Sequence, residues 1–315
     1  MLLEKIKESK NIIISSHVSP DGDAIGSGLS LYLALKKDYK NKNVKFILQD
    51  EVPDNLKFLN GSNEILKYEN IKNQNLTCDM FITVDSANLD RIGEVASLRG
   101  DSFLVNIDHH HMSNPLFGDI NIVRECSSAS ELIFFILRDV LDIKLNKDIA
   151  EAIYVGIVTD TGNFKYESTT KDTFYAASEL INFDIDRNKI TNNIYRNKSL
   201  GALKTIGKAL SEMKIDDDKK LVYFILEKEF IEKENIKKFE TEEVVTTILD
   251  YKNCEISVFL KEIKDNKIKG SLRSKTYIDV NKIANLFNGG GHKRAAGFTT
   301  TLKNKEIIDI IKKNI

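Results

Sequence analysis

The stretch NIIISSHVSPDGDAIGS, residues 11–27, contains the pattern on which the fold prediction depends. The run of isoleucines at its start predicts a buried strand that ends just before His17. Pro20 and Gly22 then predict a turn, and the amphipathic segment at 24–37 predicts a helix. A strand that passes through a polar loop into a helix is typical of the start of an α/β fold.

The same alternation of apolar runs and amphipathic segments continues to about residue 187. Further strand-like runs are VKFIL at 44–48, MFITV at 80–84 and FLVNI at 103–107. A second helix is expected at 128–141, where Ser128 and Glu131 have the spacing of a capping box. Strands that alternate with helices predict a parallel sheet, so the fold class expected for this part is α/β.

The chain is long enough for two domains, and the pattern of apolar and polar residues changes once along it. Residues 188–201, NKITNNIYRNKSLG, are polar and are interpreted as a linker between a first domain at 1–187 and a second at 202–315. The second domain is expected to be a smaller α+β domain. Its strands are predicted near 221–226, 255–262 and 267–272, and its helices near 280–287 and 304–314.

Composition limits the class of protein. Of the 315 residues, 42% are hydrophobic and 30% are charged, which is typical of a soluble globular protein, and no apolar run reaches the length that crosses a membrane. The formal net charge of −1 argues against tight, sequence-independent binding to long nucleic acid. The N-terminal segment lacks the apolar core of an export signal. We therefore expect a cytoplasmic protein whose phosphate ligands are small.

Acidic and imidazole side chains follow the expected strands, at the edge where a parallel sheet binds ligands. They are His17, Asp21 and Asp23 in the first loop, Asp85 after the strand at 80–84, Asp108, His109 and His110 after the strand at 103–107, and Asp160 at the end of an apolar, helix-length stretch. Clustered aspartates repel one another, and divalent cations relieve that repulsion. Mixed carboxylate and imidazole ligands suit manganese, iron or zinc, and they are numerous enough for two ions that share a carboxylate.

Several of these residues also have a plainer interpretation. Asp23 could cap the helix that follows it, Asp85 could be a turn residue, and Asp160 could cap or turn a helix end. His111 continues the histidine run, but three adjacent side chains cannot all point into one site, and it is interpreted as solvated. Capping explains one aspartate of the first loop but neither the second nor His17, so a metal site is the favoured interpretation.

Five segments in order along the chain, SHVSPDGDA, VDSANLDRIG, IDHH, GIVTDTG and NGGGHKRAAG, resemble the motifs of the DHH phosphoesterase family. The resemblance is to its nanoRNases and phosphatases of pAp, adenosine 3′,5′-bisphosphate, and it makes the second domain a DHH-associated domain. It implies one metal ion held by His17, Asp21 and Asp85, and another held by Asp23, Asp85, His109 and Asp160. Asp85 would bridge two divalent ions, manganese by expectation and magnesium as the alternative.

The resemblance also gives roles to the remaining residues. It implies that Asp108 supports the metal ligands and that His110 faces the scissile phosphate or the leaving oxygen. Substrate binding is expected from Arg91 and from a set in the second domain, Arg273, Gly289, Gly290, Gly291 and His292. Arginine can bind a phosphate through two N–H groups, and glycines let backbone N–H groups approach an anion closely.

The predicted function is hydrolysis of short single-stranded RNA to mononucleotides, of the 3′-phosphate of pAp, or of both, by two-metal chemistry. A phosphodiesterase of cyclic dinucleotides, or of linear products such as pApA and pGpG, is the alternative within the same class. A nucleotide-binding regulator without catalysis is the alternative from another class, but no metal ligand is missing. The glycine cluster followed by histidine argues against a family II pyrophosphatase. The partners expected are short RNA or small nucleotides and no membrane, with a homodimer left open.

Overall fold

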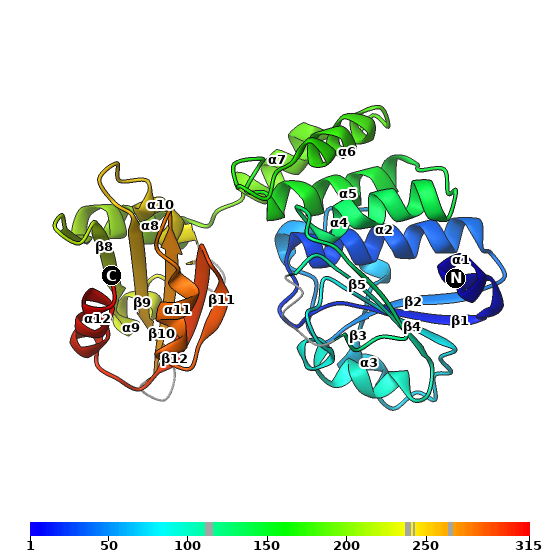
Figure 1. Ribbon diagram of the computed structural model, residues 1–315, viewed down its shortest axis with the longest axis horizontal. Helices are drawn as coiled ribbons and strands as arrows, with labels where there is room; N and C mark the ends of the chain where they lie inside the picture. The colour runs from blue at the N-terminus through cyan, green and yellow to red at the C-terminus, as the bar shows by residue number, and fades with distance from the viewer. Residues whose placement is uncertain (111–115, 237–240, 242, 264–266) are drawn as a thin grey trace. The chain divides into compact units, whose positions relative to one another are not determined.

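The computed structural model describes residues 1–110, 116–236, 241, 243–263 and 267–315 (Figure 1). The chain divides into two units, unit 1 at Met1–Asn197 and unit 2 at Lys198–Ile315. The division falls inside the range 188–201, more than half of which belongs to the helix α7 (Arg187–Tyr195). Each unit has its own sheet and its own apolar core.

Unit 1 is built on a six-stranded parallel sheet in the order β3-β2-β1-β4-β5-β6. Its strands are β1 (Asn11–Ser15), β2 (Asn43–Leu48), β3 (Leu66–Lys67), β4 (Met80–Val84), β5 (Phe103–Asp108) and β6 (Ile120–Val123). All five residues of β4 are buried, because a central strand of a parallel sheet is covered on both faces. The predicted α/β class is therefore confirmed. The sequence pattern did not indicate β3 and β6, which are the edge strands.

Helices cover the sheet of unit 1. They are α1 (Leu2–Glu8), α2 (Gly22–Asp38), α3 (Tyr68–Ile71), α4 (Ala129–Phe135), α5 (Lys147–Asp160), α6 (Lys171–Ile181) and α7, with short 3₁₀ segments η1 (Asp54–Leu56), η2 (Ser62–Glu64) and η3 (Leu89–Arg99). Glycines let α2 and α5 approach closely, since a Cβ on Gly26 would lie 2.5 Å from the carbonyl oxygen of Ala152. A Cβ on Gly22 would lie 2.3 Å from Oγ1 of Thr159. The start of α2 therefore lies beside the end of α5.

The helix expected at 128–141 differs from the prediction in two ways. It is α-helical only to Phe135 and continues as the π-helical segment η4 (Ile136–Val140). Oγ of Ser128 accepts a hydrogen bond from the N–H of Glu131 at 3.0 Å, as a cap should. Glu131 does not complete a capping box, because its carboxylate accepts instead from the hydroxyls of Ser127 and Thr173. The competing donor Thr173 comes from α6, which no local pattern could have indicated.

Unit 2 contains a six-stranded mixed sheet in the order β11-β12-β10-β9-β8-β7. Its strands are β7 (Lys214–Asp216), β8 (Leu221–Leu226), β9 (Ile256–Glu262), β10 (Ile268–Ser274), β11 (Gly290–His292) and β12 (Ala295–Thr300). Its helices are α8 (Leu200–Glu212), α9 (Lys228–Lys233), α10 (Glu243–Leu249), α11 (Val280–Asn285) and α12 (Asn304–Lys313). This is the smaller α+β unit that the sequence predicts. In the part of the chain that the structure describes, no helix has the length and apolar character to span a membrane.

Candidate metal centre

Four segments of unit 1 bring carboxylate and imidazole groups to one edge of the parallel sheet. His17 follows β1, and Asp85 follows β4. Asp108 is the last residue of β5, and His109 and His110 come directly after it. Asp160 is the last residue of α5, which ends beside the start of α2. Two sets of three residues have ligand atoms within 4.8 Å of one another. They are His17, Asp21 and Asp85 in one set, and Asp23, His109 and Asp160 in the other. A third such set contains Asp85, His109 and His110.

Asp85 belongs to the first set, and its side chain also faces the second. Its Oδ2 is 3.3 Å from Nε2 of His17, and its Oδ1 is 3.4 Å from Nε2 of His109. The residue is buried, and its φ of 51° lies in the left-handed region that non-glycine residues rarely adopt. This conformation occurs where β4 ends, at the edge of the sheet. The two carboxylate oxygens thus face two different histidines.

Both histidines are oriented by backbone carbonyl groups. Nδ1 of His17 lies 2.9 Å from the carbonyl oxygen of Val18, and Nδ1 of His109 lies 3.4 Å from that of Cys126. When Nδ1–H donates to a carbonyl, Nε2 carries the lone pair. In each ring Nε2 is the atom that faces the carboxylates. This is the arrangement in which histidine binds a cation.

The two aspartates of the first loop have structural partners as well. Asp21, not Asp23, caps α2, because its Oδ1 accepts from the N–H groups of Asp23 and Ala24 at 3.0 and 3.1 Å. Asp23 accepts instead from the N–H groups of Ala129 and Ser130 at 2.6 and 2.9 Å. Those groups begin α4. The capping alternative for Asp23 is thus wrong for its own helix, since its side chain points across to another one.

The cluster strongly perturbs its own ionisation. Burial, with the nearby Asp85 carboxylate, raises the pKa of Asp23 to about 7. Burial, with Asp23, raises the pKa of Asp160 to about 8. Burial would also raise the pKa of Asp85, but hydrogen bonds with His109 and His17 hold it well below its usual range.

The pKa values of the two imidazoles are raised as well, although burial acts on them in the opposite direction. Burial lowers the pKa of His17, but hydrogen bonds with Asp21 and Asp85 outweigh it and raise the pKa to about 11. The pKa of His109 is also raised, by Asp85, Asp23 and Asp160 together. Protons bound to these groups thus offset the repulsion between the crowded carboxylates, and bound cations could offset it instead. The donor set, its spacing and its oriented imidazoles fit a pair of divalent cations.

Asp108 and His110 form a pair at the margin of the cluster. Nδ1 of His110 lies 2.7 Å from Oδ1 of Asp108 and 3.7 Å from Oδ1 of Asp85. Asp108 is buried and His110 is partly exposed. The pair resembles a carboxylate that orients an imidazole. His111, which follows, lies outside the described residues.

Arg91 is exposed, and its backbone has a role that the sequence did not indicate. Its carbonyl oxygen accepts from the N–H of Val18 at 2.7 Å, which connects the segment after β4 to the loop that carries His17. In unit 2, Arg273 lies on β10, and its Nη1 donates to the carbonyl of Leu272 at 2.9 Å. Gly290 and Gly291 begin β11. His292 ends that strand, and its side chain lies outside the described part of the structure.

Backbone groups are the contributors that sequence reasoning missed. The N–H groups of Ala129 and Ser130 hold Asp23, and the carbonyl of Cys126 orients His109. Backbone groups have no residue signature. The only signal near them was the capping spacing at Ser128, which correctly predicted that a helix begins there.

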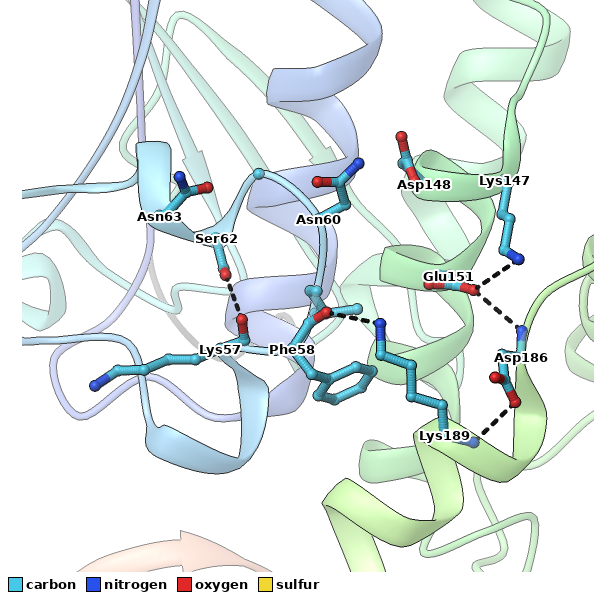
Figure 2. A pocket seen from close by; sticks show the side chains of 12 residues that line it. Lys57, Phe58, Asn60, Ser62, Asn63, Lys147, Asp148, Glu151, Asp186 and Lys189 are labelled. Carbon is cyan, nitrogen blue, oxygen red and sulfur yellow. Dashed lines mark hydrogen bonds and ion pairs between the residues drawn. The ribbon is translucent and has the colours of Figure 1, made fainter.

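A cavity of about 450 Å³ lies away from the cluster, and it contains none of the predicted site residues. Glu151, on its wall, precedes Asp160 by nine residues on α5, roughly 13 Å along the helix axis. Figure 2 shows Glu151 accepting from the N–H of Asp186 and facing Lys147, while Lys189 donates to the carbonyl of Phe58. The lining holds three lysines and three acidic residues, so its charges balance locally.

Comparison with known families gives matches to both units. A model described as the DHH family, N-terminal domain, matches residues 11–157, and a model described as the DHHA1 domain matches residues 206–315. A Bacillus subtilis protein named bifunctional oligoribonuclease and PAP phosphatase NrnA is 32% identical over 299 residues. The match covers 94% of this chain and 91% of that protein. A Streptococcus mutans protein named as probably the same enzyme is 31% identical over 307 residues, with the same coverage.

Solved structures show the same architecture. An exopolyphosphatase-related protein from Bacteroides fragilis has a TM-score of 0.91 and 35% identity, over 99% of this chain and 93% of that one. RecJ from Thermus thermophilus, solved in complex with Mn²⁺, has a TM-score of 0.57 and 14% identity, over 99% of this chain and 53% of that one. The second likeness shows a shared fold.

Proposed function

Because this chain belongs to the DHH family of phosphoesterases, with a DHHA1 domain after its DHH domain, we propose that it hydrolyses short oligoribonucleotides to mononucleotides and the 3′-phosphate of pAp. The proposal takes its substrates from the names of the relatives that match nearly the whole chain. The observation that carries it within the molecule is Asp85, whose two carboxylate oxygens face His17 and His109.

The metal assignment is part of the proposal. His17, Asp21 and Asp85 would hold one divalent cation, and the set of Asp23, Asp85, His109 and Asp160 would hold the other. Manganese is the expected ion, as mixed carboxylate and imidazole ligands favour it over calcium, and magnesium is the alternative. When bound, the cations would act as Lewis acids on the phosphate and supply a nucleophile by lowering the pKa of a water molecule toward 7.

The protein's own groups would then position the reactants. His110, oriented by Asp108 through Nδ1, would hold a proton at Nε2 for the scissile phosphate or the leaving oxygen. Arg91 of unit 1 and Arg273 of unit 2 would bind phosphates away from the cations, and the backbone around Gly290 would approach the substrate closely. Positioning of this kind can contribute much of the rate of a phosphoryl transfer.

The bridging role of Asp85, which follows β4, has a test with a matched control at the residue that precedes the same strand. Asp85→Asn should lower kcat/KM on pApA with Mn²⁺ by about a thousand-fold, since a shared ligand supports both cations and their several kcal/mol of stabilisation. Asp79→Asn alters the residue just before β4, at the opposite edge of the sheet, where Asp79 accepts from the backbone of Lys10 and Asn11. It should leave turnover near the wild-type value. Near-normal turnover of Asp85→Asn would refute the bridge.

The substrate assignment is tested separately with the unaltered protein. Purified chain with Mn²⁺ should be assayed on RNA of two to five nucleotides, on pAp, on pApA and pGpG, and on cyclic dinucleotides. We expect short RNA and pAp to be cleaved to mononucleotides. Turnover confined to cyclic dinucleotides and their linear products would replace the proposed substrates with the phosphodiesterase alternative.

A further inference from the structure

The chain turns sharply just after Asp160. Gly162, Asn163 and Phe164 have φ values of 56°, 62° and 64°, three successive residues in the left-handed region. For a bulky residue such as phenylalanine this conformation is rare. The N–H of Asn163 donates to the carbonyl of Val158 at 2.7 Å, and the N–H of Phe164 donates to Oγ1 of Thr161 at 3.0 Å. These bonds fix the turn.

The turn presents aromatic rings to solvent. Phe164 stacks on Phe174 of α6, with ring centroids 5.4 Å apart and an interplanar angle of 18°. Tyr166 lies against Gly162, where a Cβ would come within 2.5 Å of its Cζ. Phe174 is 57% exposed and Tyr166 is 51% exposed, so both rings offer a face to solvent. We call Phe164, Tyr166 and Phe174 the aromatic ledge.

Short segments and hydrogen bonds connect the ledge to one of the two ligand sets. Gly162 follows Asp160 by two residues. On the other side, the hydroxyl of Thr173 donates to the carboxylate of Glu131 at 2.7 Å, which fastens the start of α6 to α4. The first N–H groups of α4 hold Asp23. Asp160 and Asp23, which belong to the same set, are thus both connected to the ledge by short structural links.

The size and chemistry of the ledge favour one kind of ligand. Two half-exposed rings offer far less than the roughly 800 Å² per partner that a stable protein interface needs, since a whole aromatic side chain buries about 150–250 Å². A flat, apolar face of this size matches a nucleobase. Stacking on an aromatic side chain contributes about 1–3 kcal/mol per base and tolerates any base, because every base has a π face.

We propose that the aromatic ledge stacks the base of the nucleotide whose phosphate would be bound by the cation held at Asp23, His109 and Asp160. The inference rests on the proposed function and adds a base site to it. It restricts the substrates to those with an unpaired base near the scissile phosphate, because a base inside a duplex has no exposed face. It also predicts little discrimination between the bases.

A pair of neighbouring substitutions on α6 tests the ledge by kinetics. Phe174→Ala should raise KM for pApA so that kcat/KM falls by about 5- to 150-fold, which is 1–3 kcal/mol of stacking. It should not change kcat/KM for a dinucleotide backbone of the same length without bases. Tyr175→Ala is the matched control, since Tyr175 is 47% exposed, but its ring stacks on Phe135 and its hydroxyl accepts from Arg138. It should not affect either substrate.

Equal effects of Phe174→Ala and Tyr175→Ala on kcat/KM would refute the proposal that the ledge stacks a base. An equal loss of kcat/KM on the substrate without bases would refute it as well. If the unaltered protein cleaves neither compound, the proposed function fails instead, and the ledge is then tested by binding alone. The chain contains no tryptophan, so the tryptophan fluorescence of a Phe174→Trp variant comes from that position only. AMP should quench it by stacking, whereas ribose 5-phosphate should not. Absence of quenching by AMP would refute the base site whether or not the protein is a hydrolase.

Discussion

In unit 1 the aspartates of the candidate metal centre also form hydrogen bonds that hold helices in place, whereas in unit 2 the loop proposed to bind substrate contains one glycine, Gly290, with room around it for a side chain. Asp21 caps α2 and Asp23 holds the start of α4. In unit 2, a Cβ on Gly289 would lie 2.3 Å from the carbonyl oxygen of Gly297, and one on Gly291 would lie 2.5 Å from that of Ala295. Among the described residues, a Cβ on Gly290 would approach only Oδ1 of Asn281, at 3.9 Å.

This difference decides what a substitution can reveal. A change at Asp23 removes a candidate ligand and a helix cap together, so lost activity cannot be separated from lost structure. A change at Gly290 adds a methyl group to open space, so lost activity would report on a ligand. The glycines at 289 and 291 have a sufficient structural explanation in the close approach of β12, while Gly290 has none.

Among the substitutions that test this difference, the largest effect is expected from Gly156→Ala, which shows whether a change in helix packing in unit 1 also disturbs the candidate metal centre. The new Cβ would lie 1.8 Å from Oγ of Ser130 and 2.8 Å from Oδ1 of Asp23. Overpacking costs about 1–3 kcal/mol, and a displacement of about 1 Å can lower turnover about a hundred-fold. Denaturation midpoints and kcat/KM measure the two effects.

Gly207→Ala in α8 is the control for that substitution. A Cβ there would meet nothing within 4 Å in the part of the chain that the structure describes, and alanine is favoured over glycine in a helix by about 1 kcal/mol. It should therefore stabilise the chain slightly and leave turnover unchanged. If Gly156→Ala behaved like Gly207→Ala, the close packing of α5 on Asp23 would be unimportant for the centre.

The pH dependence of stability should differ between the metal-free and the metal-loaded chain. The pKa values of Asp23 and Asp160 are raised to about 7 and about 8, so their contribution is complete below the unfolded value near 4 and is lost as pH rises toward 8. His17 acts in the same direction between about 6.5 and 11. Cations would replace these protons. The gain in Tm from Mn²⁺ over EDTA should therefore grow from pH 5 to pH 8.

The corresponding gain in the free energy of unfolding can change by at most about 1.4 kcal/mol per pH unit for each group. Asp160→Asn removes one of the raised carboxyl groups and should flatten the pH dependence of the metal-free chain. A gain in Tm that is constant with pH would contradict competition between protons and cations in the cluster. A rise of metal-free stability between pH 5 and pH 8 would contradict the sign of the pKa shifts.

The smallest effect is expected in unit 2, from Gly290→Ala. It should leave the free energy of unfolding within about 0.5 kcal/mol of the wild-type value and raise KM for pAp about ten-fold, or 1.4 kcal/mol. Gly291→Ala is the contrast, because its φ of 148° and its contact with β12 predict a loss of stability. If Gly290→Ala left KM unchanged, the glycines would have a structural role only.

Local patterns predicted the strands that carry the site residues. β1 and β4 lie where the isoleucine run and MFITV place them, since a central strand of a parallel sheet is a continuous apolar run. The family and the enzyme class are confirmed by the comparisons. The roles of individual residues as metal ligands stay predictions, although the structure brings the expected six together at one edge.

Two interpretations were wrong, and in both the side chain has a hydrogen-bond partner from a distant part of the chain. Glu131 was assigned to its own helix end, but it binds Thr173 of α6. The alternative considered for Asp23, a cap on its own helix, is wrong as well, because its carboxylate accepts from α4. A local sequence pattern indicates only the hydrogen-bond partners that lie close to a polar side chain in sequence. Packing brings in partners from more than 40 residues away for Glu131 and more than 100 residues away for Asp23.

The sequence by itself determined the order of strands and helices in the core of unit 1 and the types of ligand that follow them. Periodicity and the position of each polar residue after an apolar run are local properties, which require no knowledge of neighbours. Only the tertiary structure decided which oxygen of Asp85 faces which histidine, which helix each aspartate caps, and that the strained turn after Asp160 stacks Phe164 on Phe174 of α6. These depend on contacts between segments far apart in the chain, where side-chain direction is set by packing.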